Sequence, residues 1–93
     1  MKIIYQVKFI NSFNQIWDFI SLDSKTRANQ FKKEVKKKIE ELENMPFKFR
    51  QSIYFEDESI RDLIFKGYTI VYKVDKERDA IIIIGIKKYQ DGL

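Results

Sequence analysis

The residues best suited to chemistry lie near the end of the chain, where Lys87, Lys88 and Tyr89 follow an apolar segment. Lysine stabilises a phosphate anion, and a lysine beside other cations loses its proton more readily and can act as a base. A phenol can donate a proton or stack on a nucleobase. Together with Arg61, these residues are the candidate catalytic group, because their side chains can transfer protons and stabilise an anionic group. The alternatives are a solvated chain end and, for Arg61, an ion pair with a neighbouring acid.

Further cations are candidates for binding a nucleic acid or another anionic target. Lysines spaced three or four residues apart form a ridge on a predicted helix, where they either bind phosphate or face solvent. Arg50 follows the only proline and either contacts phosphate or anchors its loop. Arg61 and Lys66 lie five residues apart on a predicted strand, which places them on opposite faces. The binding candidates are Arg50, Lys66, Lys73, Lys32, Lys33, Lys36 and Lys37.

The composition excludes several kinds of site. The 93-residue chain contains neither cysteine nor histidine, so disulfides, zinc–thiolate sites and histidine-based catalysis are impossible, and we expect no metal and no cofactor. No apolar run approaches the roughly 18 residues of a membrane span, and residues 1–9 do not read as a signal peptide. We therefore expect a cytoplasmic protein with one domain over residues 1–93. The net charge of +4 favours anionic partners.

The first half of the chain predicts a strand and two helices. Residues 2–9 alternate between apolar and polar side chains, which is typical of a strand. Apolar residues at helical spacing over residues 12–23 predict a short helix with Asn11 or Ser12 as its N-cap. A longer apolar stripe predicts a second helix over residues 24–44, whose first residue, a serine, is the N-cap.

The second half of the chain predicts three strands, over residues 60–66, 68–75 and 80–86, with a tight corner at Gly67. Residues 52–56 are either a weak strand or an extended segment. Residues 80–86 are apolar on both faces, which is typical of a central strand, so the first strand is expected to pair beside them. The predicted fold is α+β with the order β-α-α-β-β-β: two N-terminal helices packed on one face of a mainly antiparallel, roughly four-stranded sheet.

With these residues, the layout resembles the RelE/ParE superfamily of toxins from type II toxin–antitoxin modules. The resemblance rests on the helix pattern of residues 27–42, the connector of residues 46–50, the Ile-Arg-Asp-Leu of residues 60–63 and the strand that begins with Gly67-Tyr68. The family implies a small toxin, also known from plasmid stabilization systems, that a cognate antitoxin neutralises. RelE-like members are mRNA interferases that cleave mRNA on the ribosome, whereas ParE-like members inhibit DNA gyrase.

The sequence departs from the nuclease pattern of that family. The resemblance implies lysines on the strand before the Gly-Tyr corner, an arginine directly after it, and an Arg/Tyr or His/Tyr set near the C-terminus. In this sequence Ile60 and Asp62 stand at the lysine positions and Thr69 at the arginine position, while residues 87–89 include neither arginine nor histidine. Whether the protein is an enzyme stays open. If it is one, we expect a metal-independent, ribosome-dependent endoribonuclease.

Three functions remain open from the sequence. The first is a toxin acting on the ribosome and its mRNA or on DNA gyrase, the second is a non-toxic module for RNA or DNA binding, and the third is a decayed toxin that retains only antitoxin binding. We expect a cognate antitoxin as partner and no membrane. Two helices can cover only one face of the sheet, whereas residues 80–86 present apolar side chains on both faces. The second face therefore needs a cover. An antitoxin or a second copy of the chain, as a homodimer, would supply it.

Overall fold

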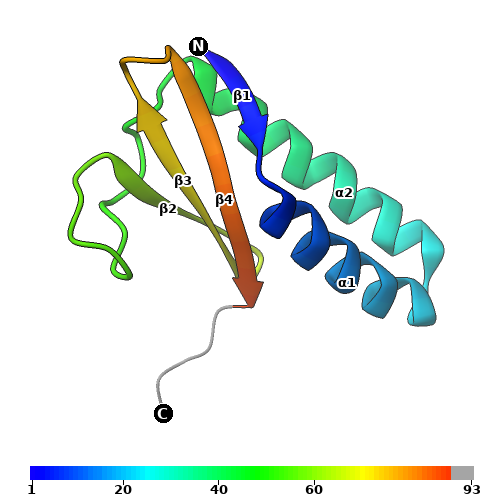
Figure 1. Ribbon diagram of the computed structural model, residues 1–93. Coiled ribbons are helices and arrows are strands. Elements are labelled where there is room, and N and C mark those ends of the chain that lie inside the picture. The colour runs from blue at the N-terminus through cyan, green and yellow to red at the C-terminus, as the bar shows by residue number, and fades with distance from the viewer. Residues whose placement is uncertain (89–93) are drawn as a thin grey trace.

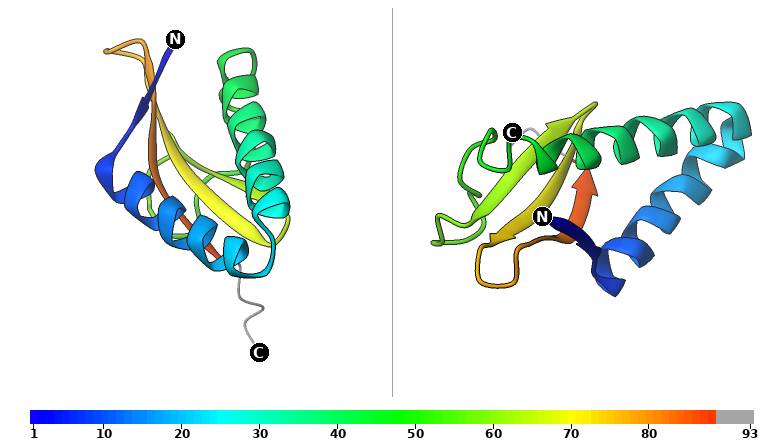
Figure 2. Two further views of the ribbon diagram at one scale, coloured as in Figure 1. Left: turned by 90° about the vertical axis from the view of Figure 1, so that its right-hand side faces the viewer. Right: turned by 90° about the horizontal axis from the view of Figure 1, so that it is seen from above.

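The computed structural model describes residues 1–88 and places two helices on one face of a four-stranded sheet (Figure 1). The sheet has the order β1-β4-β3-β2, with β1 parallel to β4 and the other pairs antiparallel. Figure 2 shows that α1 and α2 form one layer beside the twisted sheet. The α+β prediction is confirmed, including the place of the first strand beside β4. The elements are β1 (Lys2–Tyr5), α1 (Val7–Asp23), α2 (Lys25–Glu40), the 3₁₀ turn η1 (Glu41–Glu43), β2 (Ile60–Phe65), β3 (Tyr68–Asp75) and β4 (Ala80–Lys88).

The boundary between β1 and α1 differs from the prediction. The strand ends at Tyr5 and the helix begins at Val7, so Asn11 and Ser12 lie inside the helix and cap nothing. The reason is that Phe9 suits both patterns: it continues the strand-like alternation of residues 2–9, and it lies four residues before Phe13, which is a helical spacing. As a helical residue it is buried beside Phe13, with the two ring centroids 5.9 Å apart. Burying both rings against the sheet outweighs extending an edge strand.

The second helix begins as predicted, because the Ser24 hydroxyl oxygen accepts a hydrogen bond from the backbone N–H of Arg27 at 3.1 Å. This cap satisfies one of the amide groups that the first helical turn leaves free. The apolar stripe of α2 and η1 then packs onto the sheet side chains that point toward the helices. The buried core consists of Phe9, Phe13, Phe31, Val35, Ile39, Leu42, Leu63, Ile70, Tyr72, Val74, Ile81, Ile83 and Ile86.

The corner between β2 and β3 is a two-residue turn. Lys66 and Gly67 have φ angles of 48° and 81°, and Phe65 pairs with Tyr68 across the turn. Two consecutive left-handed residues match the twist of an antiparallel hairpin, and glycine adopts that conformation without a steric cost. The sequence prediction of a corner at Gly67 is confirmed.

An irregularity in β4 decides which way its last residues point. Val71 pairs with Gly85 but Tyr72 pairs with Ile83, so Ile84 is an extra residue in the β3–β4 ladder. Such a bulge shifts the alternation by one residue. Ile86 therefore lies in the core under the helices, and Lys87 lies on the open face of the sheet.

The segment between η1 and β2 is a long loop rather than a strand. Its pairing with the sheet is limited to an isolated bridge between Gln51 and Arg61, with hydrogen bonds such as that from the Ser52 N–H to the Ile60 carbonyl at 2.7 Å. The alternative of a strand over residues 52–56 is therefore wrong. In Figure 1 this loop lies beside β2, at the edge of the sheet away from β1.

Candidate functional site

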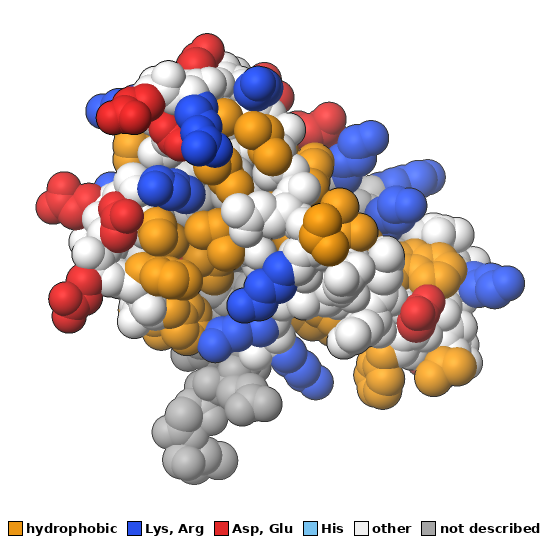
Figure 3. Space-filling model, viewed as in Figure 1, with side chains coloured by type: hydrophobic (Ala, Val, Ile, Leu, Met, Phe, Trp, Pro, Cys, Tyr) orange, Lys and Arg blue, Asp and Glu red, His pale blue; other side chains and the backbone are white. Residues whose placement is uncertain are grey.

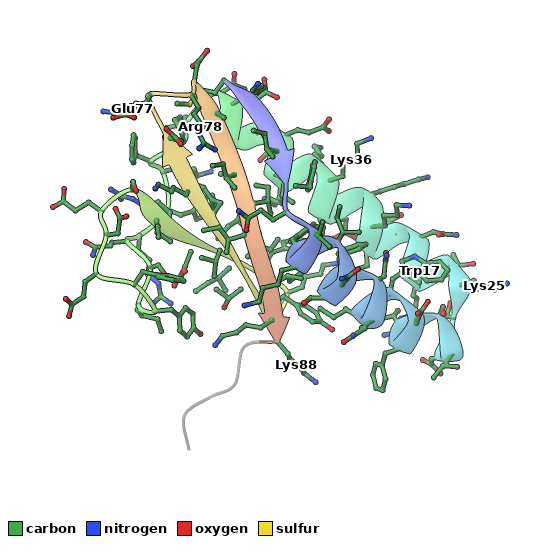
Figure 4. The ribbon with its side chains drawn as sticks, viewed as in Figure 1. Trp17, Lys25, Lys36, Glu77, Arg78 and Lys88 are labelled. Atoms are coloured by element: carbon green, nitrogen blue, oxygen red, sulfur yellow. The ribbon has the colours of Figure 1, made fainter. Side chains whose placement is uncertain are left out.

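The two C-terminal lysines of β4 point to opposite faces of the sheet. Lys87 pairs with Thr69 on the open face, and its Nζ lies 3.6 Å from the centroid of the Tyr54 ring. Lys88 pairs with Tyr68, which packs on the helix side, and Figure 4 shows it at the end of β4. Tyr89 lies outside the described residues. Only one of the two lysines can therefore contribute to a site on the open face.

The guanidinium of Arg61 donates hydrogen bonds to backbone carbonyl groups of the long loop. Its Nε donates to the Glu58 carbonyl at 2.8 Å, and its guanidinium also donates to the Phe49 carbonyl at 3.2 Å. The guanidinium carbon lies 4.9 Å from the centroid of the Phe47 ring. Arg61 shares a face of β2 with the core residue Leu63, whereas Lys87 lies on the opposite face of the sheet. The fold does not bring these two candidate catalytic residues together.

Asp62 anchors the long loop from the open face of β2. Its side chain is 1% exposed, and its Oδ2 accepts a hydrogen bond from the Ile53 N–H at 3.1 Å. Arg50 lies 3.6 Å from the same oxygen, so this candidate for phosphate binding pairs with a carboxylate of its own chain. A buried carboxylate is stable only when such partners compensate for its lost hydration. Sequence reasoning did not single out Asp62 for this role.

Ile60, Asp62 and Thr69 occupy the three positions where the resemblance implied basic nuclease residues. Ile60 and Thr69 are 8% and 0% exposed, so none of the three positions presents a side chain to solvent. The Thr69 hydroxyl has no hydrogen-bond partner among the described residues, and neither has the second oxygen of Asp62. The long loop thus closes over the part of the open face where a nuclease would expose cations.

Lys66 and Lys73 lie at separate places. Lys66 forms an ion pair with Glu34 of α2 at 2.7 Å, and its hydrogen bond holds the pKa of the Glu34 carboxyl below the ordinary value. Lys73 lines a shallow groove of about 590 Å³, whose lining also includes Arg61, Glu58 and Glu77. Because carboxylates alternate with cations there, this groove does not present the single-sign charge that attracts a polyanion.

The lysines of α2 form an exposed ridge. Figure 4 shows Lys25 and Lys36 projecting from the helix into solvent, and the ridge candidates Lys32, Lys33, Lys36 and Lys37 are all exposed. Their charges are therefore available to an anionic partner, but they lie on the helix layer and not beside Lys87.

A groove with a volume of about 710 Å³ lies between α1, α2 and the β2–β3 corner. Phe19 and Leu22 at the end of α1 line it and are 73% and 86% exposed, while Phe31 and Tyr68 form part of its lining. Its rim carries the Glu34–Lys66 ion pair. Sequence reasoning missed this groove, although Phe19 and Leu22 are apolar residues that fall outside the buried stripe of α1.

Neither a metal site nor a membrane span is found in residues 1–88. The acidic side chains there form no group of three or more that could hold a metal ion. No helix in this part combines the length and the apolar character needed to cross a bilayer.

The fold and these surfaces define a small α+β protein with two helices on one face of an open sheet. The match to the family model described as "ParE toxin of type II toxin-antitoxin system, parDE" covers residues 3–91, so the chain belongs to this family of type II toxin–antitoxin toxins. A search of curated proteins finds no match. A chromosomal ParDE toxin–antitoxin system of P. aeruginosa is similar in structure, with a TM-score of 0.77, 15% identity and coverage of 97% of each chain. The isolated E. coli RelE toxin has a TM-score of 0.63 at 16% identity, over 98% of this chain and 86% of that one.

Proposed function

We propose that this toxin inhibits growth by binding DNA gyrase and not by cleaving RNA. The observation that carries the proposal is the burial of Ile60, Asp62 and Thr69, which stand where the nuclease pattern has basic residues. A phosphoryl-transfer site must expose cations and proton donors to its substrate. Here an isoleucine, a carboxylate that anchors a loop and an unexposed hydroxyl take those places. The match to the ParE family model supports the same choice.

Induced expression of the toxin without any antitoxin tests this function. We expect filamentous cells with DNA damage, and we expect the purified protein to inhibit supercoiling of relaxed plasmid by gyrase. Protein synthesis should continue during the first minutes after induction. Rapid loss of translation with cleaved mRNA would contradict the proposal.

Ribosome-dependent mRNA cleavage is the second candidate function. It is favoured by Lys87 on the open face, which lies beside the aromatic ring of Tyr54, because RNA-binding sites combine cations with stacking surfaces. In that case Lys87→Gln should abolish mRNA cleavage, while Lys88→Gln, on the opposite face, should preserve it.

The exposed groove beside Phe19 and Leu22 is the proposed binding site of a cognate antitoxin. An amphipathic helix could place apolar residues against these side chains and the Phe31 ring. The lysine ridge of α2 would attract an acidic antitoxin segment. The double change Phe19→Ser and Leu22→Ser should weaken binding of the cognate antitoxin. Both residues are exposed, so folding should be preserved.

A further inference from the structure

The long loop has an inverted distribution of side chains. Ser52 of the loop and Asp62 of the adjoining strand β2 are polar and only 4% and 1% exposed, whereas Ile53, Tyr54 and Phe55 of the loop are 63%, 41% and 44% exposed. Buried polar residues and grouped apolar residues on the surface are the two arrangements that folding alone does not favour. Figure 3 shows hydrophobic side chains gathered over the region of this loop. We call residues 53–55 and Ile64, which is 44% exposed and lies on the same face of β2 as Asp62, the loop surface.

The loop surface is held in place by specific contacts. The Ile53 N–H donates to Asp62 Oδ2, and the Tyr54 N–H donates to the Ser52 hydroxyl oxygen at 3.2 Å. The ammonium group of Lys87 packs against the Tyr54 ring. These bonds fix the backbone that carries the apolar side chains, which reduces the entropy that a partner would have to remove on binding.

The charges around the loop surface select a protein as its partner. Arg50 lies beside Asp62 and Lys87 lies against the Tyr54 ring, and the exposed carboxylates of Glu56 and Glu58 follow in the same loop. Those carboxylates would repel the phosphates of a nucleic acid, whereas a protein surface can present an acid to Arg50 and a base to Glu56. Aromatic residues and isoleucine surrounded by mixed charges are typical of the centre and rim of a protein interface.

We infer that the loop surface is where this toxin binds its protein target, at a site separate from the antitoxin groove. This inference rests on the proposed function, because it assumes that the toxin acts by binding a protein. The groove lies between α1, α2 and the β2–β3 corner, and the loop surface lies on the open face of the sheet. Each surface can therefore be changed without touching the other.

The test compares two matched double variants. Ile53→Ser with Phe55→Ser alters the loop surface, and Phe19→Ser with Leu22→Ser alters the groove. Each is measured for growth inhibition after induction, for inhibition of purified gyrase, and for affinity toward the cognate antitoxin. We expect the loop variant to need at least about tenfold more protein for inhibition, which is typical of losing central interface residues, while its antitoxin affinity changes less than about twofold. The groove variant should lose affinity for the antitoxin but inhibit growth and gyrase at about the same protein concentration as the wild type.

Three outcomes would overturn the inference. The first is a loop variant that folds by circular dichroism and inhibits growth as strongly as the wild type. The second is an equal loss of antitoxin affinity, which would assign the loop surface to the antitoxin. The third is a wild-type dimer in light scattering that the loop variant breaks, which would assign the surface to a second copy. Failure of the gyrase proposal is seen separately, as a wild-type protein that stops growth without inhibiting gyrase.

Discussion

The side chain of Asp62 accepts a hydrogen bond from the backbone N–H of Ile53 at 3.1 Å, across the open face of the sheet. This contact connects β2 to a loop that the sequence alone leaves undefined. It also uses, for a structural purpose, a position where a nuclease of this superfamily would expose a lysine. The same bond thus supports both the proposal of a non-nuclease mode of action and the fixed position of the loop surface.

Replacing Asp62 with alanine should destabilise the protein. The change leaves the Ile53 N–H without its partner and Arg50 without its counter-charge, and an unsatisfied buried polar group costs about 1–3 kcal/mol. Urea denaturation followed by circular dichroism measures this loss. The exposed Glu77→Ala is the matched control and should change the unfolding free energy by less than about 0.5 kcal/mol. Equal stability of both variants would mean that the loop is not anchored by Asp62.

Tyr72 should make the stability depend on pH in the alkaline range. Burial raises the pKa of its phenol to about 12, although nearby Arg61 partly opposes this effect. Since the folded state keeps the proton that the unfolded state releases near pH 10, the stabilisation is complete below pH 10 and is lost as the pH rises toward 12. Tyr72→Phe should remove the contribution of this residue to the pH dependence, which urea denaturation at several pH values would measure.

The same substitution has a cost at neutral pH. The Tyr72 hydroxyl donates to the Pro46 carbonyl at 2.7 Å and so connects β3 to the start of the long loop. Losing this bond should cost about 0.5–1.5 kcal/mol at pH 7. A Tyr72→Phe protein with unchanged stability at pH 7 and an unchanged alkaline profile would contradict both expectations.

Some parts of the fold follow from local sequence signals and others do not. The N-cap Ser24 and the Lys66-Gly67 corner are set by residues within a few positions, so the sequence predicts them. The start of α1 was mispredicted because the residues around Phe9 suit either period, and only burial against the sheet decides between them. The exposure of the candidate site residues depends on tertiary contacts.

The open face of the sheet illustrates that dependence. The bulge at Ile84 decides on which face of the sheet Lys87 lies, and no residue type in the sequence predicts this bulge. Asp62 reaches Ile53 only because the loop folds back over β2, a contact between residues nine positions apart. The sequence therefore indicates which residues carry charge, while the packing of the loop decides which of them can meet a partner.

The two glycines of the β2–β4 meander should respond oppositely to alanine. Neither Gly67 nor Gly85 has a non-neighbouring atom within 4 Å of the position of an added Cβ, so a methyl group fits at both positions. Gly67 has a φ of 81°, which strains any L-residue, and Gly67→Ala should cost about 1 kcal/mol. Gly85→Ala should leave stability unchanged or raise it slightly, because alanine reduces the freedom of the unfolded chain. Thermal unfolding of the two variants makes the comparison, and equal melting temperatures would contradict it.

The lysine ridge of α2 should act on the rate at which an acidic partner associates. Changing Lys32, Lys33, Lys36 and Lys37 to glutamine removes exposed charges without altering the apolar stripe that holds the helix on the sheet. Exposed charges raise the rate at which a partner associates more than they slow its dissociation. The association rate with an acidic segment of the antitoxin should therefore fall by about tenfold at low salt. The dissociation rate should change by less than about twofold. Surface plasmon resonance at low and high salt measures both rates. The control for net charge is a variant in which four exposed lysines outside α2, Lys2, Lys8, Lys48 and Lys76, are changed to glutamine. If the wild-type association rate does not vary with salt, the ridge plays no part in attracting the partner.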